Sequence, residues 1–361
     1  MIKIDMKNYG LSERFINESK LYEGFTIGRV TSQDKGLYKV VTENGEKRAE
    51  VSGKFRYNTV SLSDYPAVGD FVMLDENEDG NAIIHHVLTR KSVFIRKAAG
   101  TSNENQVVAA NIDTVFICMS PNNDFNLRRL ERYMGVAWDS GAKPVVVLTK
   151  SDLCGNLDDI LSELETVALS VDIIVTSGIN EDGYSAVKKY IEKCKTVAFI
   201  GSSGVGKTTL INKLIGKNIY ETKETRNDDR GRHTTTKREL IALPSGGVVI
   251  DTPGMRELGI ESADLSKAFS DIDELSKQCR FSDCSHKNEP GCAVREAIEN
   301  GILSEERFAS FFKLKKETKY DGLNSKQIED KKLNEMFKDF GGMKNARKYI
   351  KSKNNKKYGY D

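Results

Sequence analysis

The sequence lacks the features that would assign it to a membrane, secreted or repetitive class. Its longest apolar runs, such as residues 144–148, are far shorter than the roughly 20 residues that a membrane-spanning helix requires. The first residues, MIKIDMKN, contain no apolar segment of the kind found in secretory signals, and no internal repeat is present. We therefore expect a cytoplasmic protein without a membrane partner, and we also expect a monomer.

Cysteine is sparse, with six residues in the chain. Three of them lie between Cys279 and Cys292, and in a chain without a signal this clustering favours metal binding over a disulfide framework. We interpret the others, Cys118, Cys154 and Cys194, as small buried residues.

Net charge is also small, at +2, but it is unevenly distributed. Residues 311–361 hold fifteen basic and seven acidic side chains, a net of +8, which leaves −6 on the rest of the chain. A basic tail on an acidic body indicates a polyanionic partner, nucleic acid before membrane. The alternative is a Lys-rich helix that is simply solvated.

The length of 361 residues suggests two or three domains, and the first of these is rich in short strands. The turn signals Asn44-Gly45 and Asp79-Gly80 separate several of the β-rich runs. Five such runs predict a small barrel of SH3 or OB type. The strands are expected at 27–31, 37–42, 46–52, 70–75 and 82–87.

After about residue 100, near-continuous apolar strands alternate with helical stretches, which is typical of a parallel sheet covered on both faces. The strands are expected at 113–120, 144–149, 172–176, 196–200 and 248–250, and helices at 127–139 and 208–215. From about residue 263 onward we expect only helices, at 265–277, 293–300, 304–316 and 325–340.

One segment matches the phosphate-binding pattern GxxxxGK[ST] and lies between a predicted strand and a predicted helix, the context in which a P-loop occurs. Backbone N–H groups of such a loop surround the phosphates, Lys207 reaches the β- and γ-phosphates, and the Thr208 hydroxyl binds Mg²⁺. The residues expected to contact the nucleotide are Gly201, Ser202, Ser203, Gly204, Val205, Gly206, Lys207, Thr208 and Thr209.

Asp251 directly follows the apolar strand at 248–250 and begins the tetrapeptide Asp-Thr-Pro-Gly. A carboxylate at a strand end downstream of a P-loop is typical of the second magnesium ligand, and the Gly254 N–H is expected to meet the γ-phosphate. The tetrapeptide alone would favour a simple turn.

A second tetrapeptide, Thr149-Lys150-Ser151-Asp152, indicates that the base is guanine. The Asp152 carboxylate can accept hydrogen bonds from N1–H and the 2-amino group, both of which adenine lacks. The Lys150 stem is expected to pack along the base, and Thr149 offers one hydroxyl where many such motifs carry Asn. The segment after the next strand, Thr176, Ser177 and Gly178, is expected to supply a backbone contact to the guanine oxygen.

The chain order of these motifs is guanine motif, base-contact loop, P-loop and Asp-Thr-Pro-Gly, whereas an ordinary GTPase begins with the P-loop. A permuted chain can build the same sheet, because site geometry and not chain order sets the chemistry. Permutation also means that the chain leaves the domain just after residues 251–254, a segment that senses the γ-phosphate.

Cys279, Cys284, His286 and Cys292 supply three thiolates and one imidazole within fourteen residues. This set suits one tetrahedral Zn²⁺ with no open position, and hence a structural site. The alternative is three unlinked cysteines. His85 and His86 lie on a predicted strand and point to opposite faces, so they are not expected to share a metal.

With these motifs in place, the sequence resembles the circularly permuted GTPases that depend on the small ribosomal subunit, the RsgA/YjeQ family. The resemblance covers roughly residues 24–310 and rests on the permuted motifs, the segment GRHTTT at 231–236 and the Cys₃His spacing. Gly28-Arg29-Val30, Val68-Gly69-Asp70 and Arg90-Lys91 fit that family's N-terminal OB domain. The resemblance implies action late in 30S assembly, with binding to the immature subunit and its 16S rRNA and release upon GTP hydrolysis.

We therefore predict a multidomain α/β protein with three parts. An N-terminal segment and OB-type β-barrel occupy residues 1–99, and a circularly permuted P-loop GTPase domain occupies 100–264. A C-terminal helical zinc-binding domain with the basic tail occupies 265–361.

Met255 occupies the position at which many GTPases carry the Gln that orients the attacking water, and a thioether cannot do this. We therefore predict slow intrinsic hydrolysis, catalysed with the help of Lys207 and stimulated strongly by the partner. His233 is the candidate for orienting the water, with a solvated loop histidine as the alternative. The hydroxyl of Thr234 or Thr235 is expected to bind Mg²⁺.

Two other functions remain open at this point. One is an RNA-binding assembly or placeholder protein whose nucleotide site is only regulatory. Met255 is compatible with this function, because it cannot orient the attacking water. The other is a permuted GTPase of large-subunit assembly, against which the barrel and the Cys₃His segment argue. On the barrel, Phe55, Arg56 and Tyr57 are candidate RNA contacts, although Phe55 could equally belong to the core.

Overall fold

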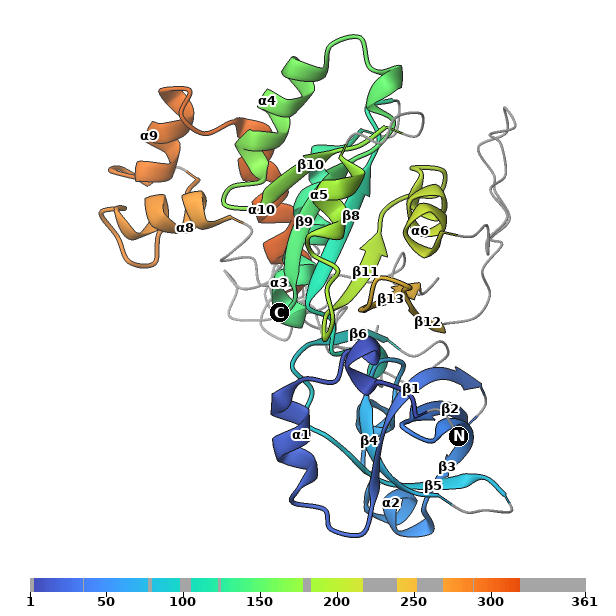
Figure 1. The fold of residues 1–361 in the computed structure, drawn as a ribbon. Helices are drawn as coiled ribbons and strands as arrows, with labels where there is room; N and C mark the ends of the chain where they lie inside the picture. The colour runs from blue at the N-terminus through green and yellow to red at the C-terminus, as the bar shows by residue number, and fades with distance from the viewer. Residues whose placement is uncertain are drawn as a thin grey trace, which may run out of the picture.

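A computed structural model of the chain shows three units, a barrel, an α/β sheet and a helical C-terminal unit (Figure 1). It describes residues 3–34, 36–76, 80–97, 105–122, 125–177, 183–216, 239–251, 269–287 and 289–318. The helix predicted at 325–340 and the turn residue Asp79 lie outside this part of the chain. Within it, no helix has both the length and the apolar character needed to cross a membrane.

Five strands close the N-terminal barrel. They are β1 (Thr26–Asp34), β2 (Leu37–Thr42), β3 (Gly45–Val51), β4 (Phe71–Asp75) and β5 (Ala82–Val87). β1, β2 and β3 form an antiparallel meander, β3 pairs in parallel with β5, and β4 is antiparallel to both β5 and β1. This closed five-stranded arrangement is that of an OB barrel, as predicted.

The barrel interior is apolar and tightly filled, and its core includes Val40 and Leu74. A Cβ atom at Gly28 of β1 would lie only 2.4 Å from a Val40 methyl carbon, so glycine is required there. The β2–β3 turn uses residues 43 and 44, one position earlier than the predicted Asn44-Gly45 pair, and Gly45 already belongs to β3.

Short helices surround the barrel. They are η1 (Met6–Tyr9), α1 (Glu13–Ser19), α2 (Gly53–Asn58) and η2 (Leu62–Asp64). α2 begins after Ser52, whose hydroxyl accepts a hydrogen bond from the Phe55 N–H at 3.0 Å and so satisfies a free donor of the first turn. Phe15 of α1 is fully buried against Phe71 of β4, so this helix belongs to the barrel core.

The central sheet has the strand order β10-β9-β8-β11-β13-β12. Five of its strands are parallel: β8 (Thr114–Met119), β9 (Lys143–Leu148), β10 (Asp172–Val175), β11 (Thr196–Ile200) and β13 (Val248–Asp251). β12 (Glu239–Ala242) is antiparallel to β13. The predicted alternation of strands and helices is thus confirmed.

Helices cover both faces of this sheet, which explains the near-continuous apolar strands. α3 (Leu127–Ser140) and α4 (Leu157–Val167) pack on one face, and α5 (Tyr184–Lys188) and α6 (Lys207–Ile215) on the other. β8 shows the two-sided burial clearly, since Val115 and Ile117 face the first core and Phe116 and Cys118 the second.

A hairpin that sequence reasoning did not predict joins the barrel to the sheet. Its strands are β6 (Val93–Lys97) and β7 (Asn105–Ala110), which pair antiparallel on either side of the predicted limit at 99/100. The other predicted limit, 264/265, falls outside the described residues. Both domain limits therefore remain predictions.

The C-terminal unit is helical, as predicted. It contains α8 (Ser270–Lys277), α9 (Ala293–Glu299) and α10 (Glu305–Thr318), packed around buried side chains such as Phe269, Ile272 and Val294. Residues 265–268, which the prediction included in the first of these helices, lie outside the described residues.

The barrel and the sheet meet at a buried arginine. Arg29 of β1 is fully buried and donates hydrogen bonds to the carbonyls of Gly69 and Tyr9 and, at 2.9 Å, to the Thr196 hydroxyl at the start of β11. Burial lowers the pKa of Arg29 to about 9, which leaves the guanidinium charged at neutral pH. Asp113 beside it accepts from the Thr196 N–H at 2.8 Å.

The three cysteines outside the Cys₃His cluster differ in burial. Cys118 is buried as predicted, and burial raises the pKa of its thiol to about 12. The prediction was wrong for Cys154 and Cys194, which are only partly buried because each lies in a connection and not in a packed strand.

Candidate nucleotide and metal sites

The predicted nucleotide motifs gather at one edge of the central sheet. Neighbouring parallel strands end at the same edge, and each of four strands is followed there by one motif. The guanine motif follows β9, the base-contact segment follows β10, the P-loop follows β11, and Asp251 ends β13. Segments that are far apart in the sequence are therefore brought together although their chain order is permuted.

The P-loop has the backbone that its glycines predict. Gly204 and Gly206 have φ values of +80° and +93°, in the left-handed region that side chains disfavour. Gly201 has φ +141°, and a Cβ atom there would lie 2.3 Å from the Cys118 carbonyl oxygen at the end of β8. These glycines allow the loop to turn tightly and to approach the neighbouring strand.

Lys207 opens α6 directly after the loop and is buried. Its ammonium donates to the Gly201 carbonyl at 2.8 Å and to the Ser202 carbonyl, so it lies inside the curve of the loop. Ser203 and Gly204, by contrast, are exposed at the tip of the loop.

The two predicted base-reading segments are bonded to each other. The Ser177 hydroxyl donates to the Asp152 carboxylate at 2.7 Å, and the Ser151 N–H donates to the Thr176 carbonyl at 3.2 Å. Lys150 has φ +55°, which turns the chain sharply after β9. No pattern in the sequence indicates the Ser177–Asp152 bond, and Gly178 lies outside the described residues.

Thr149 directs its hydroxyl to the protein backbone. This side chain is only 4% exposed, and its Oγ1 donates to the Met119 carbonyl at 2.9 Å and to the Val205 carbonyl of the P-loop. The first residue of the guanine motif thus touches the phosphate-binding loop directly, which spacing alone does not indicate.

The two residues predicted to bind magnesium lie at the ends of adjacent strands, one in the helix after β11 and one at the end of β13. Thr208 is the second residue of α6, which follows β11, and Asp251 ends β13, which pairs with β11. Hydroxyl and carboxylate oxygens are ligands that Mg²⁺ accepts. The other residues predicted here, His233, Thr234, Thr235, Gly254 and Met255, lie outside the described residues.

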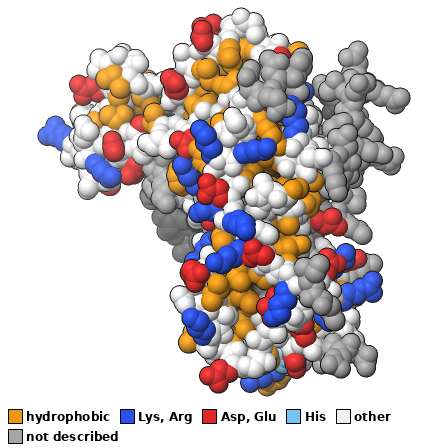
Figure 2. Space-filling model, viewed as in Figure 1, with side chains coloured by type: hydrophobic (Ala, Val, Ile, Leu, Met, Phe, Trp, Pro, Cys, Tyr) orange, Lys and Arg blue, Asp and Glu red, His pale blue; other side chains and the backbone are white. Residues whose placement is uncertain are grey.

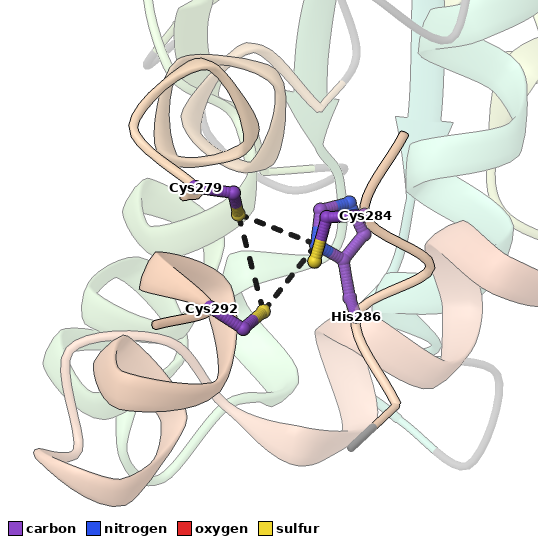
Figure 3. Close-up of side chains that lie close together, drawn as sticks. All are labelled: Cys279, Cys284, His286 and Cys292. Atoms are coloured by element: carbon purple, nitrogen blue, oxygen red, sulfur yellow. Dashed lines mark hydrogen bonds between the residues drawn. The ribbon is translucent and has the colours of Figure 1, made fainter. Parts of the chain in front are cut away.

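The Cys₃His cluster is assembled in the C-terminal unit (Figure 3). One ligand atom from each of Cys279, Cys284, His286 and Cys292 lies within 4.8 Å of all the others. The sulfurs of Cys279 and Cys292 are 3.9 Å apart and lie 3.6 and 3.5 Å from His286 Nδ1. Tetrahedral zinc bonds predict about 3.8 Å between sulfurs and about 3.6 Å from sulfur to nitrogen, so the donor set fits zinc.

The surroundings of His286 set the ring for metal binding. The Ser276 hydroxyl donates to the Ile272 carbonyl at 2.7 Å and lies 3.2 Å from His286 Nε2, so it can accept the Nε2 proton. That tautomer leaves the Nδ1 lone pair directed at the sulfurs. Burial lowers the pKa of His286, which also favours the neutral ring. His85 contacts the Phe25 ring and His86 the Tyr22 ring, and that the two histidines share no metal stays a prediction.

The three candidate RNA contacts of the barrel differ in their surroundings. Phe55 is partly buried and packs edge-on against Tyr65, so it belongs to the barrel core. Arg56 lies 3.7 Å from Glu50, and Tyr57 is 90% exposed. On the face shown in Figure 2, basic and acidic side chains are interspersed.

The fold and these two sites define a circularly permuted P-loop GTPase with an N-terminal OB barrel and a C-terminal Cys₃His domain. The chain belongs to the RsgA GTPase family: the family model described as RsgA GTPase matches residues 87–261. The small ribosomal subunit biogenesis GTPase RsgA 2 of Lactiplantibacillus plantarum is 47% identical over 351 residues, which cover 97% of this chain and 98% of that protein.

Solved structures agree with this assignment. YjeQ from Thermotoga maritima is similar with a TM-score of 0.63 and 29% identity, and the match covers 81% of this chain and 98% of that one. YloQ, described as a circularly permuted GTPase, is similar with a TM-score of 0.60 and 26% identity, over 82% of this chain and 96% of that one. The permuted order read from the sequence therefore has a structural counterpart.

Proposed function

We propose that this chain hydrolyses GTP at the carboxyl edge of its central sheet and acts in biogenesis of the small ribosomal subunit. The observation that carries the proposal is the gathering of a guanine motif, a P-loop and a strand-end aspartate at that edge. The name of its 47% identical relative, a small ribosomal subunit biogenesis GTPase, supports the biological role.

Each residue of the edge has a role in this proposal. Asp152 accepts from the guanine N1–H and 2-amino group, and the Ser177 hydroxyl holds its carboxylate in place. The P-loop N–H groups bind the phosphates, and the Lys207 ammonium exchanges its bonds to loop carbonyls for bonds to phosphate oxygens. Thr208 and Asp251 would bind Mg²⁺, together with the hydroxyl of Thr234 or Thr235. When bound, the ion would neutralise negative charge on the phosphates.

Hydrolysis also requires an oriented water. Met255 cannot provide a hydrogen bond for it, so we assign this role to His233 in the segment that follows α6 in the chain. In this proposal the partner places His233 against the water, so we expect a slow intrinsic rate and a high stimulated rate.

The partner in this proposal is the 30S subunit with its 16S rRNA, met in the cytoplasm by a monomer. The OB barrel offers the exposed Tyr57 for base stacking, and the tail at 311–361 adds a net charge of +8 that attracts phosphate groups. One zinc ion holds the Cys₃His domain together without taking part in the reaction. GTP hydrolysis releases the protein from the subunit.

The test is GTP hydrolysis measured alone, with purified 30S subunits and with purified 50S subunits. We expect stimulation by 30S only, and loss of both rates in Lys207→Ala. His233→Ala should keep GTP affinity and lose the stimulated rate. Equal rates with and without 30S subunits would contradict the proposal, and stimulation by 50S alone would assign the chain to the other subunit.

A further inference from the structure

We propose that Thr149 is a positioning residue that ties the guanine-reading motif to the P-loop and makes no contact with the base. The inference rests on the proposed function, since it concerns how the same site works. It gives the first residue of the guanine motif a different task from Asp152, which reads the base in the proposal above.

The geometry comes from three strand ends. Thr149 follows β9, Met119 ends β8, and Val205 lies in the loop after β11. The Thr149 N–H donates to the Met119 carbonyl at 2.7 Å, and its hydroxyl lies within bonding distance of both the Met119 and Val205 carbonyls. One side chain thus links three neighbouring strands at the edge where the nucleotide motifs lie.

The chemistry of a hydroxyl excludes a base contact from this position. A threonine side chain has one donor hydrogen, and here two backbone carbonyls share it. Guanine presents only acceptors, N7 and O6, at the edge opposite the one that Asp152 reads. A contact with the base would therefore require a second donor hydrogen, which the Thr149 hydroxyl lacks. Thr149 is also 96% shielded from solvent.

The same contact fixes the phosphate-binding lysine. Val205 is followed by Gly206, whose left-handed backbone leads directly into Lys207. A Cβ atom at Gly206 would lie 3.7 Å from Cβ and Oγ1 of Thr149, so the loop packs on this side chain. Thr149 therefore sets the position of the 205–207 backbone, while Asp152, three residues further on, reads the base.

The decisive variants are Thr149→Val, which keeps the shape and removes the hydroxyl, and Thr149→Ser, which keeps the hydroxyl. We expect Thr149→Val to weaken GTP and GDP binding about tenfold, because the Val205 carbonyl loses the hydroxyl that ties the P-loop to the guanine motif, whereas the Met119 carbonyl keeps the Thr149 N–H. Thr149→Ser should restore affinity to within about threefold of the parent. Thermal unfolding and circular dichroism of each variant would establish that it is folded at the temperature of the binding measurement.

A nucleotide analogue separates positioning from base contact. Wild type and Thr149→Val are each titrated with GTP and with 7-deaza-GTP, which lacks the N7 acceptor. Positioning predicts that both nucleotides weaken by the same factor, so that their affinity ratio is the same in the two proteins. A ratio that collapses toward one in Thr149→Val would overturn the inference, as would unchanged GTP affinity in that variant. Failure of the wild type to bind GTP would instead contradict the proposed function.

Discussion

Arg307 of α10 donates to Glu131 of α3 across 2.8 Å, and both side chains are almost completely buried. Glu131 also accepts from the Ser310 hydroxyl at 2.8 Å, and Arg307 donates through two nitrogens to Asp271 at 2.7 and 2.8 Å. The pair joins a helix of the GTPase sheet to the Cys₃His domain. The C-terminal unit is therefore held on the sheet by a buried ion pair, with the partly exposed Asp271 as a second acceptor for Arg307.

Replacing Arg307 by Ala should destabilise this contact by about 1–3 kcal/mol, since the buried Glu131 would lose one of its two arginine partners and keep Arg128 at 2.7 Å. Chemical denaturation followed by circular dichroism measures the loss. Lys277→Ala is the matched control, because Lys277 forms an exposed pair with Asp273 at 3.1 Å on the same unit. The control should change stability by less than about 1 kcal/mol. Equal effects of the two substitutions would show that the buried pair does not hold the unit.

Zinc removal should unfold the C-terminal unit and leave the barrel and sheet folded. Structural zinc contributes on the order of 10 kcal/mol to small domains, and the helices of this unit have a small core of their own. Metal analysis should give one zinc per chain, and a chelator at neutral pH should remove the helical signal of residues 269–318. A folded chain with far less than one zinc would refute the assignment.

Ser276→Ala should weaken zinc binding roughly 10- to 100-fold, because His286 loses the hydroxyl that accepts its Nε2 proton. Competition with a chromogenic chelator measures the affinity. Ser162→Ala is the control: each serine donates to the carbonyl four residues earlier, but Ser162 is exposed on α4 and far from the cluster in the chain. An unchanged affinity in Ser276→Ala would mean that the hydroxyl does not orient the ring.

Gly201→Ala should lower GTP affinity by about tenfold or more, since φ +141° and a Cβ atom 2.3 Å from the Cys118 oxygen both force the loop to move. Gly155→Ala is the matched control, because its backbone is ordinary and nothing lies within 4 Å of its Cβ position. Fluorescent GDP titration compares the two. A normal affinity in Gly201→Ala would show that the entry to the loop tolerates displacement.

Asp152→Asn should change the preferred base from guanine to xanthine. The amide oxygen can still accept from N1–H, but its NH₂ group now donates, which suits the 2-oxo group of xanthine and opposes the 2-amino group of guanine. We expect GTP affinity to fall by about 100-fold and XTP affinity to rise. Asp158→Asn, an exposed carboxylate on α4, should change neither. A loss of both affinities would assign Asp152 a structural role.

Local patterns predicted much of this molecule. Strand alternation located all five barrel strands, and apolar runs located β8, β9, β10, β11 and β13. The P-loop and the Cys₃His set could be read directly, because phosphate binding and zinc coordination restrict residue type and spacing within short segments. The hairpin of β6 and β7 was not predicted, since Arg96 and Lys97 in the first strand and Asn105 and Gln106 in the second interrupt the apolar pattern.

Contacts between distant segments could not be read in this way. In the sequence, Arg29, Glu131 and Arg307 look like ordinary charged residues. Only the fold shows that each is buried in a contact with a unit other than its own. Arg29 and Thr196 are 167 positions apart, and Glu131 and Arg307 are 176 apart. Such pairs have no fixed spacing, so periodicity carries no information about them.

Glu239 of β12 pairs on one side with Ser32 of the barrel and on the other with Asp251 at the end of β13. One residue thus separates a barrel strand from the proposed magnesium ligand. Because coupling between two binding sites is reciprocal, an RNA that tightens GTP binding through this connection must itself be held more tightly by the GTP form, by the same factor. The affinity of the barrel for RNA then reports which nucleotide occupies the sheet.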